Sequence, residues 1–300
     1  MRARKQDGVA LIQVLLISSL IMLLALQIGF NVKTQVRLAS GFVDKLNAEM
    51  QIYSAQSQVT YELLTRSHGQ PAENNDAEAL DWNFHGEPFR VGNVRVSLQD
   101  ANGLISMIST SRSIQSHYLQ HYGLPEEKAG ILETSIKNWQ NDQAKWQFGG
   151  VPIQNFTDYG VTPRFAPIQF KSEYSDILKV LMQDEPSLLT TIDQAVDCCM
   201  TLYASSYINI LNSPPQIWAA LIDSSYLQDL ESARQSGTLN KHNFKAITGT
   251  QTSDDYGFLN SNDMLMTFEV QQGEIRMRAL LDITLQPNND IAPYLIKAKS

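Results

Sequence analysis

Few residues in this 300-residue chain combine the type and spacing that catalysis or metal binding requires. His117 and His121 lie four residues apart, a spacing that can bring two imidazoles to one face of a helix. A zinc protease motif with this spacing has glutamate directly after its first histidine, but Tyr118 holds that position here. The sequence also contains no nucleophile elbow, Walker loop, dinucleotide-binding glycine pattern or CxxC pair. It therefore predicts that the protein is not an enzyme.

The cysteines are the second group of reactive side chains. The chain has only Cys198 and Cys199, and they are adjacent. Adjacent cysteines rarely form a relaxed disulfide with each other, because a disulfide usually joins Cα atoms that are farther apart. We expect buried thiols that serve packing, with a cross-link to another chain in an oxidising compartment as the alternative.

Overall charge and length narrow the classes of function. The formal net charge is −8 and the isoelectric point is about 5.1. Such an acidic chain is a poor binder of nucleic acid, so no nucleic-acid partner is expected. The length is enough for about two domains with cores of their own.

The N-terminal region predicts a membrane anchor. Arg2, Arg4 and Lys5 precede a stretch over residues 9–30 that has no charged residue. As a helix this stretch would be about 33 Å long, which is enough to cross a bilayer. It exceeds the apolar core of a secretory signal, and no small-residue cleavage site follows closely. We predict one transmembrane helix over residues 9–32, with the N-terminus in the cytoplasm and the bulk of the chain outside.

Gly8 stands between the basic head and this span. A glycine in that place, followed by a long helix, resembles the type IV prepilin and pseudopilin signal. The resemblance implies that residues 1–8 are a leader, that prepilin peptidase cleaves between Gly8 and Val9, and that Val9 is then N-methylated.

Gln13 departs from the usual pattern of that signal. Most members carry glutamate at the fifth mature position, where the N-terminal amine of a neighbouring subunit compensates it. An uncompensated carboxylate costs up to about 3 kcal/mol at the bilayer centre. Gln13 lacks the charge that would neutralise a subunit ahead of it, so we expect this chain at an end of a filament.

Helical periodicity continues beyond the membrane, over residues 33–65. Gly69 and Pro71 then supply stop signals, and residues 71–79 have the composition of a loop. The sequence thus predicts one unbroken helix of nearly sixty residues. A coiled-coil stalk is the alternative, but it would require stricter heptads than this stretch has.

Two strand regions flank the middle of the chain. We predict a first hairpin from residues 89–98, a turn at 99–103 and a strand at 104–108. A second hairpin is predicted from residues 264–270 and 274–285, with its turn at 271–273. The two hairpins would form one antiparallel sheet, and the outer half of the long helix would cover its apolar face.

The region between the hairpins is rich in helix signals. We predict helices over residues 113–122, 125–139, 172–182 and 216–222, the last one after an extended run at 207–215. The predicted organisation is a pilin-like domain in two parts, 33–110 and 256–300, interrupted by a helical domain over 111–255. Residues 226–262 fit loops and short helices equally well.

These features together resemble the K-type minor pseudopilin family of the type II secretion system (general secretion pathway protein K). The chain has the length that is typical of this family. Its features also follow the family's order: the leader, Gln13, the first hairpin, residues 135–142, residues 207–222 and the final hairpin. The resemblance implies an α+β fold, in which a long helix packs on an antiparallel sheet and a large, mainly helical domain is inserted.

The same resemblance implies a structural role. Such a subunit lies at the pseudopilus tip with the I- and J-type minor pseudopilins and, through them, the major pseudopilin. The subunit is anchored in the inner membrane. It initiates assembly, limits filament length and supports export of folded proteins across the outer membrane. The alternatives are a minor pilin of a type IV pilus and a membrane-anchored envelope hydrolase. A hydrolase would require a deep pocket with convergent titratable groups, which we expect to be absent.

Calcium is the one cofactor that the resemblance suggests. Family members carry carboxylates around the 135–142 element, but amides replace them here, which leaves Asp142 as the local carboxylate. Calcium prefers six to eight oxygen ligands, several of them charged, so any site would be weak. Its possible ligands are Asn138, Asn141, Asp142, Asp158 and Glu173. The alternative is that these are solvated polar residues.

Overall fold

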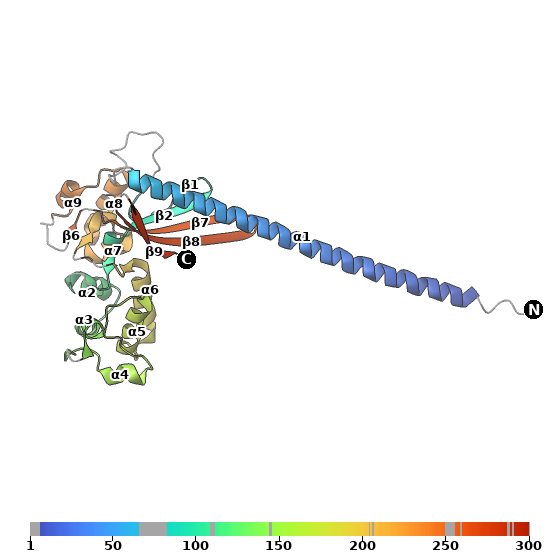
Figure 1. Ribbon diagram of the computed structural model, residues 1–300. Coiled ribbons are helices and arrows are strands. Elements are labelled where there is room, and N and C mark those ends of the chain that lie inside the picture. Colours follow the sequence, from blue (N-terminus) through green and yellow to red (C-terminus); the bar gives the residue numbers. More distant parts are fainter. Residues whose placement is uncertain are drawn as a thin grey trace, which may run out of the picture.

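The computed structural model describes residues 7–65, 83–108, 112–143, 146–203, 205, 207–249, 256–258, 260–286, 289 and 291–299. Figure 1 shows three parts: a long helix that projects far beyond the rest of the molecule, a sheet under the end of that helix, and a group of shorter helices beside the sheet. The predicted α+β architecture is confirmed.

Helix α1, Asp7–Thr65, is 59 residues long and unbroken. No proline interrupts it, and its long apolar and polar side chains favour a helix. Only its last part is packed, through Ala48, Ile52, Ala55, Val59 and Leu63, which recur every three or four residues. The predicted long helix is confirmed, while the predicted stop at 69–71 and the loop at 71–79 lie outside the described residues.

The sheet has five strands in the order β1-β2-β7-β8-β9, and all neighbours are antiparallel. The strands are β1 Phe89–Val91, β2 Val94–Asp100, β7 Asp263–Gln272, β8 Ile275–Leu285 and β9 Tyr294–Lys299. Alternate side chains of β2, β7 and β8 meet α1 and form one apolar core with it. The predicted sheet covered by the long helix and the predicted second hairpin are therefore confirmed. Strand β9 was not predicted.

The first predicted hairpin is wrong in its pairing. Gly92, with a φ of +59°, turns the chain between β1 and β2, so the hairpin forms within the segment predicted as one strand. The next strand, β3 Ile105–Ser106, pairs in parallel with β4 Met200–Thr201 and leaves the sheet. The short helix η2, Ala101–Gly103, makes this change of direction possible.

The inserted region is mainly helical, as predicted. Its longer helices are α2 Arg112–His121, α3 Glu126–Gln140, α4 Ile153–Asp158, α5 Lys171–Leu181, α6 Pro186–Cys199, α7 Pro215–Leu221, α8 Leu227–Gln235 and α9 Lys241–Thr248. Short elements join them: η4 Ile210–Asn212, η5 Ser224–Tyr226, and β5 Ile208–Asn209 paired in parallel with β6 Tyr256–Gly257. The four predicted helices correspond to α2, α3, α5 and α7, whereas α4, α6, α8 and α9 were not predicted.

The expectation for the cysteines needs correction. Cys198 and Cys199 are joined to each other by a disulfide at the end of α6. Cys199 is buried in the helical-domain core, while Cys198 is exposed. Because of this disulfide, neither cysteine is a free thiol that packs in the core.

Candidate functional site

The first half of α1 is a long, exposed apolar surface. Its large apolar side chains between Leu11 and Phe30 are 51–70% exposed. Its most apolar 18-residue window has a mean hydropathy of 2.4, and none of that window is buried. By length and composition this is one helix able to cross a membrane, among the residues that the structure describes. The described residues leave this surface uncovered, and its composition suits contact with lipid or with other helices.

The predicted processing residues lie at the start of this helix. Gly8 and Val9 belong to the first turns of α1, and the Gln13 side chain is exposed. The structure places all three on one continuous helical segment, with Gln13 inside the apolar stretch. Cleavage, methylation and the role of Gln13 remain predictions.

A buried carboxylate, Asp100, joins the sheet to the inserted domain. Its two oxygens accept hydrogen bonds from the Asn102 amide (3.0 Å), Asn209 Nδ2 (3.1 Å) and Asn212 Nδ2 (2.8 Å). Ser261 adds its backbone amide (3.1 Å) and its hydroxyl (2.5 Å). The end of β2, the 209–212 element and the segment before β7 thus meet at one charge, which these donors satisfy.

Residues beside Asp100 complete this junction. Gln99 Nε2 donates to the backbone oxygen of Asn212 at 3.0 Å. Gly103 approaches the same oxygen so closely that a Cβ atom would lie 2.3 Å from it. Only glycine fits there without a backbone shift. The sequence analysis treated the 207–215 element as an extended run and as part of the family resemblance, but it missed that the asparagines of this element bind Asp100.

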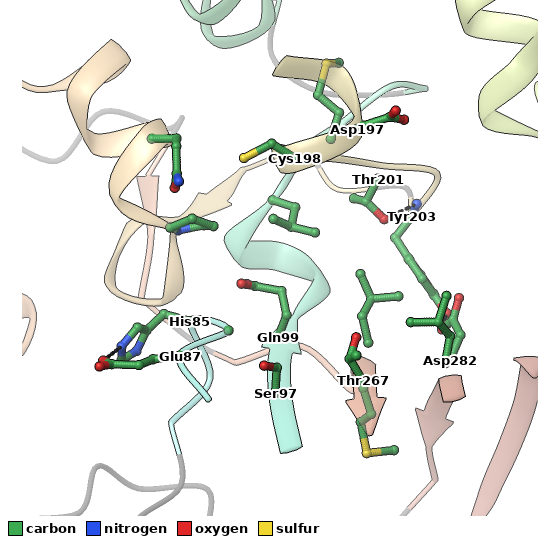
Figure 2. A pocket seen from close by; sticks show the side chains of 18 of the residues that line it. His85, Glu87, Ser97, Gln99, Asp197, Cys198, Thr201, Tyr203, Thr267 and Asp282 are labelled. Carbon is green, nitrogen blue, oxygen red and sulfur yellow. Dashed lines mark hydrogen bonds and ion pairs between the residues drawn. The ribbon is translucent and has the colours of Figure 1, made fainter. Parts of the chain in front are cut away.

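A groove of about 850 Å³ runs between the sheet and the helical domain. Figure 2 shows Ser97, Gln99 and Thr267 on one wall, with Asp197 and Cys198 at the end of α6 opposite them. We expected a deep pocket with convergent titratable groups to be absent, and a large groove with titratable side chains in its lining is present. The titratable side chains that line it include His85, Glu87, Lys171, Tyr203, Arg234 and Asp282.

Four titratable groups of the groove form two pairs, His85 with Glu87 and Tyr203 with Asp282. His85 Nε2 lies 3.3 Å from Glu87 Oε2, and burial, together with Arg234, lowers the pKa of His85 to about 4. The Tyr203 hydroxyl donates to Asp282, and burial raises the pKa of that carboxyl. His85 is therefore neutral at pH 7.

Arg234 forms one end of the groove. Its guanidinium stacks on Trp218, 3.4 Å from the ring centroid, and Nη2 donates to the backbone oxygens of Leu211 and Ser213. Burial lowers its pKa to about 10, although Glu231 and Glu87 oppose the shift. These contacts hold the 210–213 turn in place, which is a structural role for Arg234.

The residues suggested for calcium have other partners. Glu173 Oε1 accepts from Arg164 and from the amides of Gln169 and Phe170, and Oε2 accepts from Trp139 Nε1 at 2.9 Å. Burial would raise the pKa of Glu173, but the hydrogen bond from Trp139 and the other donors lower it overall. Such a carboxylate links α3 to α5, and its oxygens already have donors.

The remaining suggested ligands are arranged no better for calcium. Asn138 Oδ1 and Nδ2 bond to the backbone of Gln147, and Asn141 donates to the Lys137 carbonyl. Asp158 accepts from Gln154 and is exposed, as is Asp142. No group of three or more His, Cys, Asp or Glu side chains able to hold a metal occurs within the described part of the chain. As arranged, these residues do not fit a calcium ion, and calcium binding stays an unsupported prediction.

The two spaced histidines provide no site either. His117 and His121 are exposed on α2, and the His121 ring contacts Tyr122 edge-on. Tyr118, between them, is buried and donates to the Ala195 carbonyl at 2.9 Å. The side of α2 that carries Tyr118 therefore packs against α6, while the two histidines lie on its exposed side.

Comparisons with known proteins identify similarity to solved structures only. No family model matches the sequence, and no curated protein matches it. Among the solved structures that are similar, one matches along most of the chain. It is described as "The Crystal Structure of the GspK-GspI-GspJ complex from enterotoxigenic Escherichia coli Type 2 Secretion System". The identity is 14%, the match covers 90% of this chain and 98% of the other, and the TM-score is 0.49. At these values the function has to be argued from the chain's own residues.

Proposed function

We propose that this protein is a minor pseudopilin of a type II secretion system, a structural subunit that catalyses nothing itself. The observation that carries the proposal is the division of α1. Its second half packs on the sheet, while its apolar first half extends uncovered beyond the molecule (Figure 1). A helix of this kind serves as a membrane anchor before assembly and as part of a helical filament core afterwards. The basic head and Gly8 before it are the features of a prepilin leader.

The proposed topology follows from the charges at the ends of the span. Arg2, Arg4 and Lys5 favour a cytoplasmic N-terminus in the inner membrane, with the sheet and the helical domain in the periplasm. Prepilin peptidase would then cleave after Gly8 and methylate Val9.

Two features support a position at the pseudopilus tip. Gln13 lacks the charge that a preceding subunit's amine would require. The helical domain lies at the end of the molecule opposite the N-terminus of α1, where it would obstruct a further subunit (Figure 1). The expected partners are I- and J-type minor pseudopilins, and through them the major pseudopilin, with roles in initiating assembly and limiting length.

Mass spectrometry of the mature N-terminus in cells with the peptidase tests the class. We expect a chain that begins at a methylated Val9, and a full-length precursor for Gly8→Val. Gln6→Val, a matched change inside the leader, should be processed normally. Normal shortening of the Gly8→Val protein would overturn the proposal.

The tip position and the system need a separate experiment. In purified filaments, immunogold labelling of this chain should mark ends, and Gln13→Glu should be tolerated. Labelling along the filament would exclude the tip. Deletion should abolish export of folded proteins; loss of surface pili with normal export would favour the minor pilin of a type IV pilus.

A further inference from the structure

The face of the sheet that points away from α1 carries a row of arginines. In the strand register Arg90 lies opposite Arg95, Arg95 opposite Glu269, and Glu269 opposite Arg278. Side chains at paired positions share one face, so these four residues cross four neighbouring strands in a line of about 15 Å. We call this line the arginine row.

Among the described residues, the positive charge of the arginine row is neutralised only in part. Glu269 is shared between Arg278 Nε at 3.6 Å and Arg276 Nη2 at 3.4 Å. No ion pair to Arg90 or Arg95 is found among the described residues, and both are exposed. Like charges directly opposite each other cost roughly 0.2–1 kcal/mol of stability. The chain as a whole is acidic, with a net charge of −8. The stability of the fold therefore does not explain why two arginines lie opposite each other on this face.

An apolar and small-polar strip runs beside the arginine row. Ser97, Thr267 and Leu280 are paired across β2, β7 and β8, one row closer to the helical domain. Leu280 is 43% exposed. A hollow of about 260 Å³ extends from Arg95 and Arg278 to Ser97 and Thr267. Ser97 and Thr267 also line the large groove (Figure 2). Because both residues line the small hollow as well, the arginine row adjoins the groove.

We propose that this face is a docking surface for an acidic segment of another protein, one that carries an apolar side chain next to carboxylates. The carboxylates pair with Arg95 and Arg278, because guanidinium groups bind carboxylates with two parallel hydrogen bonds. The apolar side chain covers Leu280 at the groove mouth. The inference uses only the sheet and does not depend on the proposed role in secretion.

The distance of the arginine row from the predicted membrane span favours a protein, and not an anionic membrane, as the partner of this surface. The tip of the β7–β8 hairpin touches α1 at Asp44, since a Cβ on Gly273 would lie 2.6 Å from its carboxylate. Asp44 is about 18 Å along the helix from the end of the predicted span at residue 32. The arginine row lies about 13 Å farther along β7, well beyond a Debye length of about 8 Å from the lipid headgroups.

The test uses the full chain in a neutral detergent and a fluorescent peptide of two leucines followed by six glutamates. A matched peptide with six glutamines is the control probe. We expect the glutamate peptide to bind, with weakening by salt, and the glutamine peptide to bind at least about tenfold more weakly. The double variant Arg95→Glu, Arg278→Glu should bind the glutamate peptide roughly tenfold or more weakly. The double variant Arg95→Lys, Arg278→Lys keeps the charge and should lose less affinity for this peptide.

Lys179→Glu with Lys241→Glu changes the net charge equally on exposed helices and should leave binding within about twofold. Equal binding of both peptides, or equal loss in the two charge-reversed proteins, would overturn the proposal. Two other outcomes would replace it. Preferential binding of phosphatidylglycerol vesicles that requires the same arginines would identify a lipid surface. Self-association abolished by the arginine reversals would identify a second copy of the chain. Circular dichroism confirms that each variant is folded.

Discussion

The two hydrophobic cores of the molecule are built from differently distributed parts of the chain. The helical-domain core draws its buried residues from one stretch, Leu104 to Phe244. The sheet core combines α1 residues 48–63, the 84–98 segment and residues 264–285, so its parts are separated by the whole insertion. Between them lies the polar junction at Asp100. The contrast indicates that the helical domain can form from contacts within one stretch of the chain, whereas the sheet must close a loop of more than 150 residues, which costs chain entropy.

The strongest test of this contrast removes an aromatic ring from the sheet core. Phe268 is fully buried, so Phe268→Ala should lower the free energy of unfolding of the sheet by about 3–5 kcal/mol. Hydrogen exchange should show lost protection in β2, β7 and β8 and retained protection in α3, α5 and α6. The fully exposed Phe148 gives a matched control, Phe148→Ala, which should change little. Equal loss of protection in both regions would show that the cores unfold as one unit.

The junction provides the next largest effect. Asp100→Ala leaves the side chains of Asn209, Asn212 and Ser261 without their shared acceptor, at a cost of about 3 kcal/mol. We expect calorimetry to show two separated transitions in place of a more cooperative one. Asp184→Ala, on an exposed position, should shift the unfolding free energy by less than about 0.5 kcal/mol. An unchanged single transition would mean that apolar contacts alone couple the two cores.

His85 makes the groove sensitive to acid. Its pKa is lowered to about 4 in the folded protein, against an ordinary value of 6.5. Between these values the unfolded chain binds more protons, so stability falls as the pH drops below 6.5. From pH 7 to pH 5 this amounts to about 2 kcal/mol. Urea unfolding at both pH values should show that His85→Gln removes this part of the pH dependence. His117→Gln, on the exposed face of α2, should retain it.

Glu173 should stabilise only the helical-domain core. Glu173→Gln weakens the bonds from Arg164 and Trp139, with an expected loss of about 1.5 kcal/mol at pH 7. Because the folded pKa of Glu173 is lowered, its contribution is present above the unfolded pKa and disappears as the pH falls through the folded value. Asp158→Asn, at an exposed carboxylate, is the matched control. A loss at pH 7 that persisted unchanged in strong acid would contradict this assignment.

The smallest expected change has the opposite sign. Arg90→Thr removes the like charge opposite Arg95 and should stabilise the sheet by roughly 0.2–1 kcal/mol, measured by thermal unfolding. Arg276→Thr deletes a partner of Glu269 and should not stabilise it. Destabilisation by Arg90→Thr would indicate that the arginine row contributes to folding and would weaken the case for a docking surface.

Local sequence was sufficient for features that depend on neighbouring residues. The uncharged stretch and the apolar period predicted α1, alternation predicted β7 and β8, and prolines or glycines marked the ends of α2, α3 and α7. These signals act over a few residues, so no distant partner is needed to recognise them. They also predicted that the helical region is inserted between parts of one sheet, because the strand signals lie on both sides of it.

Tertiary structure alone decided which segments meet. Residues 104–108 were expected to pair back on β2, but β3 pairs with β4, almost a hundred residues away. Asp100 gains its side-chain partners Asn209, Asn212 and Ser261 from positions more than a hundred residues away. The arginine row exists only because β1, β2, β7 and β8 align in one register. Such contacts depend on packing and loop closure over the whole chain, and a periodic pattern within one segment carries no information about them.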